Sequence, residues 1–137
     1  MSVFYPISKD HHNQFINKPG RNTLWLRNGD KTLLGLARAA DGHTWAGKGS
    51  HMPLPIMRFL RKVKMDTLTN GELDSSFITD SDINDRKITP IIFSHSLSSN
   101  RTMFSGICKD FASHGFMVFV MDHKDGSSSY TESEDGE

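Results

Sequence analysis

Two uninterrupted apolar runs, at residues 90–93 and 116–121, constrain the fold of this chain more than any other feature. Such runs are typical of strands that are buried on both faces, as in a parallel sheet. Between them, apolar residues recur with the spacing of one helix face, and Gly115 follows as a helix stop. The helix face consists of Met103, Phe104, Ile107, Cys108, Phe111 and Ala112. Strand, helix and strand within about 30 residues form a right-handed βαβ unit. The sequence therefore predicts an α/β fold with such a unit at residues 90–121.

The first forty residues predict shorter elements joined by a polar segment. Residues 2–7 and 23–30 have the pattern of short strands, and residues 31–40 have a helical pattern. Residues 8–22 are polar and carry a Pro-Gly turn signal, so we expect a long loop there. Because the chain opens inside a strand pattern with no lead-in, we expect that residues have been lost before it.

Two other segments are polar and acidic, with few apolar residues to anchor them. Residues 66–88 predict a connection of low structural content between the first half of the chain and the βαβ unit. Residues 126–137 predict a disordered tail, because so few apolar side chains cannot offset the entropy of ordering the backbone.

The composition excludes several classes of function. The chain has 137 residues, enough for one small domain, and its 16 basic and 16 acidic side chains cancel. We therefore expect no nucleic-acid partner. No apolar run approaches the ~20 residues of a transmembrane segment. The start lacks the pattern of a signal peptide, so a cytoplasmic location is the default expectation. The histidines and the one cysteine have no zinc-site spacing, and we expect neither a metal nor another cofactor.

The loop after the first apolar run, residues 94–102, is small and polar. In open α/β sheets, ligands gather at the carboxyl ends of strands. A phosphate-binding loop would carry glycines and a lysine, and this loop has neither. An oxyanion hole and a plain connection both remain open on this pattern. Ser94 and His95 cannot form a nucleophile–base pair, because adjacent strand residues point to opposite faces.

Residues 91–128 resemble the platelet-activating factor acetylhydrolases. Those enzymes carry F-S-H-G-L-G, R-T-x-Y-S, L-A-S-H-G-F and E-H-R-D in the order in which this segment carries related stretches. The resemblance extends weakly to "VFYP" and "NTLWLRN" near the start. It implies that residues 1–137 are the N-terminal part of a single α/β-hydrolase domain, with a central, mostly parallel sheet that is incomplete here. It also implies hydrolysis of the short sn-2 acyl ester of phospholipids in lipid catabolism, with a serine, histidine and aspartate triad and no metal.

The resemblance implies one catalytic group in this chain, the backbone N–H of Leu97, as an oxyanion donor. The glycines that flank this position in the family are Ser96 and Ser98 here, which raises the question whether serine permits the loop shape. Four residues, His95, Arg101, His123 and Asp125, fall on the family's motifs, and we expect them to have structural roles near the site.

The serine nucleophile of an esterase is missing from the sequence. No G-x-S-x-G occurs, so none of the triad falls on these residues and we expect the chain to be inactive alone. Two alternatives remain: another serine esterase of the same fold, or a non-catalytic product, either a truncated remnant or a binding module.

A basic amphipathic segment begins at residue 55. Its apolar residues follow helical spacing, with arginines and lysines beside them. These apolar residues are Ile56, Phe59, Leu60 and Val63. The helix could lie on a lipid surface with this face down, or pack over the sheet with its basic face in water.

Overall fold

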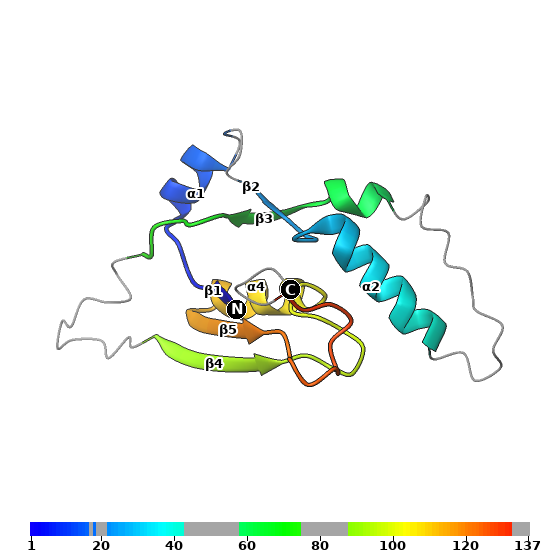
Figure 1. Cartoon of the computed structure of the whole chain (residues 1–137). Helices are drawn as coiled ribbons and strands as arrows, with labels where there is room; N and C mark the ends of the chain where they lie inside the picture. The colour runs from blue at the N-terminus through cyan, green and yellow to red at the C-terminus, as the bar shows by residue number, and fades with distance from the viewer. Residues whose placement is uncertain (17, 19–21, 43–57, 75–87, 133–137) are drawn as a thin grey trace.

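The computed structural model describes residues 1–16, 18, 22–42, 58–74 and 88–132. The predicted βαβ unit is confirmed: β4 (Thr89–Ser94) leads through α4 (Ser105–Ser113) into β5 (Phe116–Met121). The two strands pair in parallel along their whole length, from Thr89 opposite Phe116 to Ser94 opposite Met121. Figure 1 shows their carboxyl ends at the same edge of the sheet.

A third strand makes the sheet mixed. β1 (Ser2–Phe4) lies antiparallel to β5, with Val3 opposite Phe119, so the strand order is β1-β5-β4. The strand predicted for residues 2–7 is therefore shorter than expected. Pro6 follows closely and has no N–H to continue the ladder. The described chain is thus a mixed α/β structure, with α4 packed against β5 and β1.

The core of this sheet is small and lies on one side. Cys108, Val118 and Val120 are fully buried, and each of the two valines contributes about 1.5–3 kcal/mol. The prediction that both apolar runs are buried on both faces is wrong for β4, where Ile92 is 74% exposed. Ile91 and Phe93 pack against the core, so Ile92 lies on the opposite face of the sheet, where it is exposed. The predicted helix face is likewise only half buried, since Ile107 is 50% exposed.

The segment predicted as an amphipathic helix has a different structure. Its described part, from Arg58, forms a short 3-10 helix, η1 (Arg58–Lys62), followed by strand β3 (Lys64–Leu68). β3 pairs antiparallel with β2 (Asn22–Leu24), and Val63 O accepts a hydrogen bond from the Trp25 N–H at 2.9 Å. Although the apolar residues have helical spacing, hydrogen bonding to β2 makes the chain extended from Lys64 onward. The polar connection expected from residue 66 also differs, because β3 extends to Leu68.

The polar loop predicted for residues 8–22 contains a helix, α1 (Lys9–Phe15). Ser8 caps this helix, since its side chain accepts a hydrogen bond from the His11 N–H at 3.2 Å. Nε2 of His12 lies 2.9 Å from Oδ1 of Asp66 on β3. The helix has no buried residue, so it has no apolar periodicity that a sequence pattern could have revealed.

Helix α2 (Gly29–Gly42) confirms the helical pattern of residues 31–40 and buries Leu33 and Ala37. The end of the chain packs on this helix at Gly35. A Cβ at Gly35 would lie 2.2 Å from the backbone oxygen of Ser129. The structure therefore differs from the predicted disordered tail at residues 127–132. Lys31 also forms an ion pair with Glu132 at 3.1 Å. Residues 133–137 lie outside the described part.

Two glycine substitutions test this packing. Gly35→Ala should lower the free energy of unfolding by about 1–3 kcal/mol, because the new methyl group meets a backbone atom that cannot move cheaply. Gly106→Ala is the matched control in α4, where a Cβ would have no neighbour within 4 Å. It should raise the free energy of unfolding by about 0.5–1 kcal/mol. Urea unfolding of both variants measures the difference. Equal stabilisation would mean that the tail does not pack on α2.

Candidate active site

The loop that follows β4 is held against the segment that follows β5. The Ser98 N–H donates to Ser127 O at 2.7 Å, and the Ser129 N–H donates to Ser99 O at 2.7 Å. Ser99 and Ser128 form a parallel bridge. Parallel strand pairing brings the two segments together, and these backbone bonds then fix their relative position.

Two histidines from these segments stack on each other. The rings of His95 and His123 lie 4.0 Å apart at 24°, and His95 is only 4% exposed. Nε2 of His95 accepts a hydrogen bond from the His123 backbone N–H at 3.2 Å. Nδ1 of His95 therefore carries the proton and donates to Ser96 O at 2.9 Å. The sequence placed both histidines near the site, and the structure brings them into contact.

Arg101 and Asp125 have separate partners. The Arg101 side chain lies 3.2 Å from Asp122, whose carboxylate also accepts the Arg101 backbone N–H at 2.7 Å. Both side chains are mostly buried, so this pair joins the loop firmly to the end of β5. Asp125 accepts two hydrogen bonds from Ser127, which lower the pKa of its carboxyl.

The Leu97 backbone is held in place while its side chain is exposed to solvent. Within the described residues, no acceptor lies within hydrogen-bond distance of the Leu97 N–H. The preceding carbonyl, Ser96 O, accepts from Nδ1 of His95 at 2.9 Å and from the Ser99 N–H at 3.1 Å. In a trans peptide the C=O and N–H point in opposite directions, so these two bonds also fix the direction of the Leu97 N–H.

The two serines that replace the family's glycines behave differently. Ser98 has φ of 58°, in the left-handed region that favours glycine, whereas Ser96 does not have a positive φ. The loop thus adopts a left-handed conformation at one of the two positions despite the side chain. The hydrogen bond from Ser98 N–H to Ser127 O holds that conformation.

The sequence did not predict the contacts of two site residues, Ser94 and Ser127. The Ser94 hydroxyl lies 2.9 Å from Nε2 of His123, and Nδ1 of the same ring lies 2.9 Å from Oγ of Ser127. Ser94 and His95 are unpaired, as predicted, but Ser94 has an imidazole partner on the other strand. The strand register could have revealed it, because Ser94 lies opposite Met121, two residues before His123. Ser127 was not predicted as a site residue, because it belongs to the segment that was predicted to be a disordered tail.

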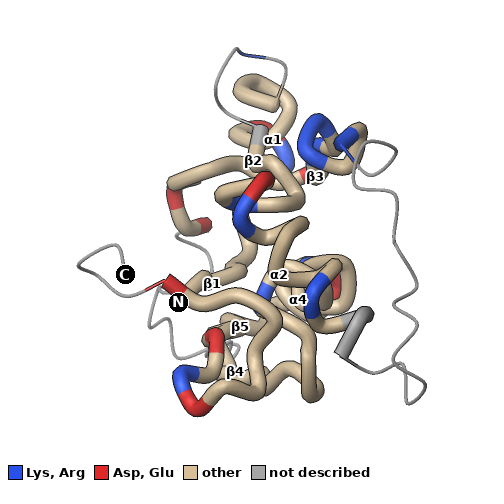
Figure 2. The backbone as a smooth tube through the Cα atoms, turned by 45° about the vertical axis from the view of Figure 1, so that its right-hand side comes forward, with Lys and Arg blue, Asp and Glu red and all other residues tan. Residues whose placement is uncertain are grey.

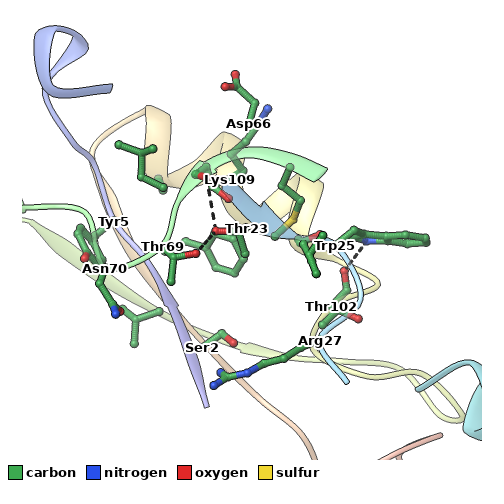
Figure 3. Close-up of a pocket in the computed structure, with 18 of the residues that line it drawn as sticks. Ser2, Tyr5, Thr23, Trp25, Arg27, Asp66, Thr69, Asn70, Thr102 and Lys109 are labelled. Carbon is green, nitrogen blue, oxygen red and sulfur yellow. Dashed lines mark hydrogen bonds between the residues drawn. The ribbon is translucent and has the colours of Figure 1, made fainter. Parts of the chain in front are cut away.

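A separate cavity of about 1490 Å³ lies between the β2–β3 pair, β1 and α4. In Figure 3, Trp25 reaches across to Thr102, to whose carbonyl oxygen its ring N–H donates at 2.9 Å. The lining mixes polar and apolar groups, among them Thr23, Arg27 and Lys109. Neither Leu97 nor the stacked histidines line this cavity.

The residues predicted to contact lipid differ in exposure. Phe59 is 61% exposed and Val63 is 37% exposed, while Leu60 is partly buried. Ile56 lies outside the described residues. Figure 2 shows basic residues gathered at η1 and the start of β3. One of them, Arg61, is paired with Asp30 at 2.6 Å.

The described residues contain no helix long and apolar enough to cross a membrane. Among the same residues, no three histidine, cysteine, aspartate or glutamate side chains cluster in a way that could hold a metal ion.

Residues 1–136 match the family described as "Platelet-activating factor acetylhydrolase, isoform II". The chain belongs to this family. It is 31% identical over 131 residues to a platelet-activating factor acetylhydrolase of Bos taurus, and 30% identical to that of Canis lupus familiaris. Each alignment covers 96% of this chain and 24% of the relative. A third relative, from Cavia porcellus, is 46% identical over 111 residues, covering 80% of this chain and 22% of the relative. The resemblance inferred from the sequence is thus confirmed, and the chain spans about a quarter of the length of these relatives.

Glycine substitutions at the two serines test the loop conformation. Ser98→Gly should raise the free energy of unfolding by about 1 kcal/mol, because glycine adopts the left-handed region without a Cβ penalty. Ser96→Gly is the control and should lower it by about 0.5–1 kcal/mol, because glycine there only adds freedom to the unfolded chain. Urea unfolding distinguishes the two. If both variants shifted in the same direction, Ser98 would not be strained.

Proposed function

We propose that this chain supplies the oxyanion loop of an esterase that hydrolyses the short sn-2 acyl ester of phospholipids. The family match over residues 1–136 supports the reaction class. The observation that carries the proposal is the Leu97 N–H, which is held in direction and has no acceptor among the described residues. A main-chain donor of this kind suits a carbonyl oxygen that becomes negative during acyl transfer.

In the proposed reaction, a serine hydroxyl adds to the ester carbonyl and a histidine takes its proton. The carbonyl oxygen then becomes an oxyanion, and the Leu97 N–H donates to it. One such donor contributes about 2.7–4 kcal/mol to the transition state in comparable sites. G-x-S-x-G does not occur in these residues. We therefore assign the family nucleophile to the part of a full-length relative that this chain does not cover, and we expect this chain alone to lack the family reaction.

His95 acts as a positioning residue in this proposal. Its Nδ1–H donates to Ser96 O, the carbonyl of the same peptide group that carries the Leu97 N–H. A hydrogen bond at the carbonyl polarises the peptide, which makes the N–H a better donor. The ring is held in turn by the His123 backbone and by stacking on the His123 ring.

Phospholipid is the proposed substrate, and contact with a lipid surface is a secondary proposal. The exposed side chains of Phe59 and Val63 could enter the interface while the neighbouring Arg58 and Lys62 meet lipid phosphates. The contact would involve η1 and the start of β3 rather than an amphipathic helix.

A graft tests the role of Leu97 in a complete catalytic site. Residues 90–129 replace the matching segment of the Bos taurus relative, and activity on a short-acyl phospholipid is first established. Leu97→Pro removes the N–H, so kcat should fall about 10²–10³-fold with little change in KM. Leu97→Ala keeps the N–H and should have a much smaller effect. Melting temperatures confirm that both variants are folded. A folded proline variant with near-parental kcat would show that Leu97 is not a donor.

The same graft tests His95 separately. His95→Leu preserves apolar contact but leaves Ser96 O with the Ser99 N–H alone, so the direction and polarisation of the Leu97 N–H are weakened. We expect kcat to fall about tenfold while KM stays near the parental value, because the donor acts mainly in the transition state. A variant in which KM rises and kcat is unchanged would contradict the positioning role and indicate an effect on substrate binding.

A further inference from the structure

The hydrogen bonds around His123 define which of its nitrogens is free of a proton. The Ser127 hydroxyl donates to Oδ1 of Asp125 at 2.6 Å. Because a hydroxyl has a single proton, Oγ of Ser127 must accept from Nδ1 of His123, 2.9 Å away. Nε2 is then the acceptor nitrogen, and it faces the Ser94 hydroxyl at 2.9 Å. Ser94 therefore donates its proton to an imidazole.

These contacts resemble those of an activated serine nucleophile. The Ser94 hydroxyl faces a base, His123, and Ser127 and Asp125 orient that base. Ser94 is exposed at the end of β4, so a reagent can reach it. The His123 ring is fixed by stacking on His95. The carboxyl of Asp125, whose pKa is lowered by the hydrogen bonds from Ser127, stays ionised near neutral pH and keeps the Ser127 proton directed away from the ring.

We propose that Ser94 is a nucleophile of this chain that accepts the acyl group of small activated esters, with His123 as its general base. This reaction goes beyond the proposed function, which assigns the family nucleophile elsewhere, and it revises the expectation that the chain has no nucleophile. It does not require the Leu97 N–H, so failure of either idea leaves the other standing.

The reaction balances with water as the second substrate. Oγ of Ser94 forms a bond to the ester carbonyl carbon and its proton passes to Nε2 of His123. The bond from that carbon to the leaving oxygen breaks, and the leaving group takes up the proton. Nε2 then removes a proton from water, and the hydroxide adds to the acylated Ser94. Release of the carboxylic acid returns the proton to Oγ of Ser94.

Ser113 provides a comparison within the same chain. It also lies beside an imidazole, with Oγ 3.3 Å from Nδ1 of His114, and it is also exposed. Its hydroxyl, however, donates to Asp110 O at 2.7 Å, and Nδ1 of His114 lies 2.8 Å from the same oxygen. That nitrogen donates as well, so it cannot act as a base for Ser113. Ser94 and Ser113 thus both lie beside an imidazole, but only Ser94 faces a nitrogen that can accept its proton.

A fluorophosphonate probe on the full 137-residue chain tests the proposal, because its adduct does not hydrolyse as an acyl group would. Attack by Oγ forms an oxygen–phosphorus bond, expels fluoride and passes the proton to His123. Intact mass and peptide mapping should find the adduct on Ser94, formed at least tenfold faster than on Ser113. His123→Gln should slow labelling about 10²-fold. Ser127→Ala, which removes the acceptor for Nδ1–H, should slow it about tenfold. Ser113→Ala should leave the rate unchanged.

Circular dichroism and melting curves establish that each variant is folded. If His123→Gln unfolds, the proposal is tested by the labelling rate of Ser127→Ala and by the ratio of Ser94 to Ser113 labelling in the parent chain. The proposal is overturned if the folded parent acquires no adduct on Ser94, or if Ser94 and Ser113 are labelled at equal rates. Ser94 labelling that is unaffected in folded His123→Gln would overturn it as well.

Discussion

The parallel pairing of β4 with β5 is the interaction on which the rest of the structure depends. It places Ser94 opposite Met121, so the two chain segments that leave these strands begin side by side. Residues 95–102 and 122–129 are far apart in sequence, and each alone is polar with little to stabilise it. When they lie side by side, backbone N–H groups of each segment donate to backbone oxygens of the other. These hydrogen bonds hold both segments in one fixed conformation.

A second level of order comes from polar contacts rather than from apolar burial. The Arg101–Asp122 pair, the stacked histidines and the serine hydroxyls all connect the same two segments. Such a network restricts the loop more than a few apolar contacts would, because each bond has a direction. It also accounts for Ser98, which keeps a left-handed φ of 58° although it lacks the freedom of glycine.

The parts of the fold that the sequence predicted correctly are those with a strong local pattern. The two apolar runs and the Gly115 stop predicted the βαβ unit, and the leucines of residues 31–40 predicted α2. The failures occur where long-range pairing decides the structure. Residues 56–63 have helical spacing, yet pairing with β2 makes a strand from Lys64 onward. The tail is polar in composition but is ordered at residues 127–132 by hydrogen bonds, an ion pair and packing on Gly35, none of which leaves an apolar pattern.

The candidate site was predictable only in part, for the same reason. The family resemblance leads to the proposal for Leu97, because a main-chain donor depends on position in a motif. It cannot indicate Ser94, whose partner is set by strand register. The two features meet at His123, which holds His95 through its backbone N–H and faces Ser94 through its ring. A backbone donor survives substitution of the side chain. Loss of the ring therefore removes the base for Ser94 and the stacking on His95, but keeps the bond that fixes the proton of His95 on Nδ1. The direction of the Leu97 N–H and the reactivity of Ser94 can thus be altered separately, although the same two segments support both.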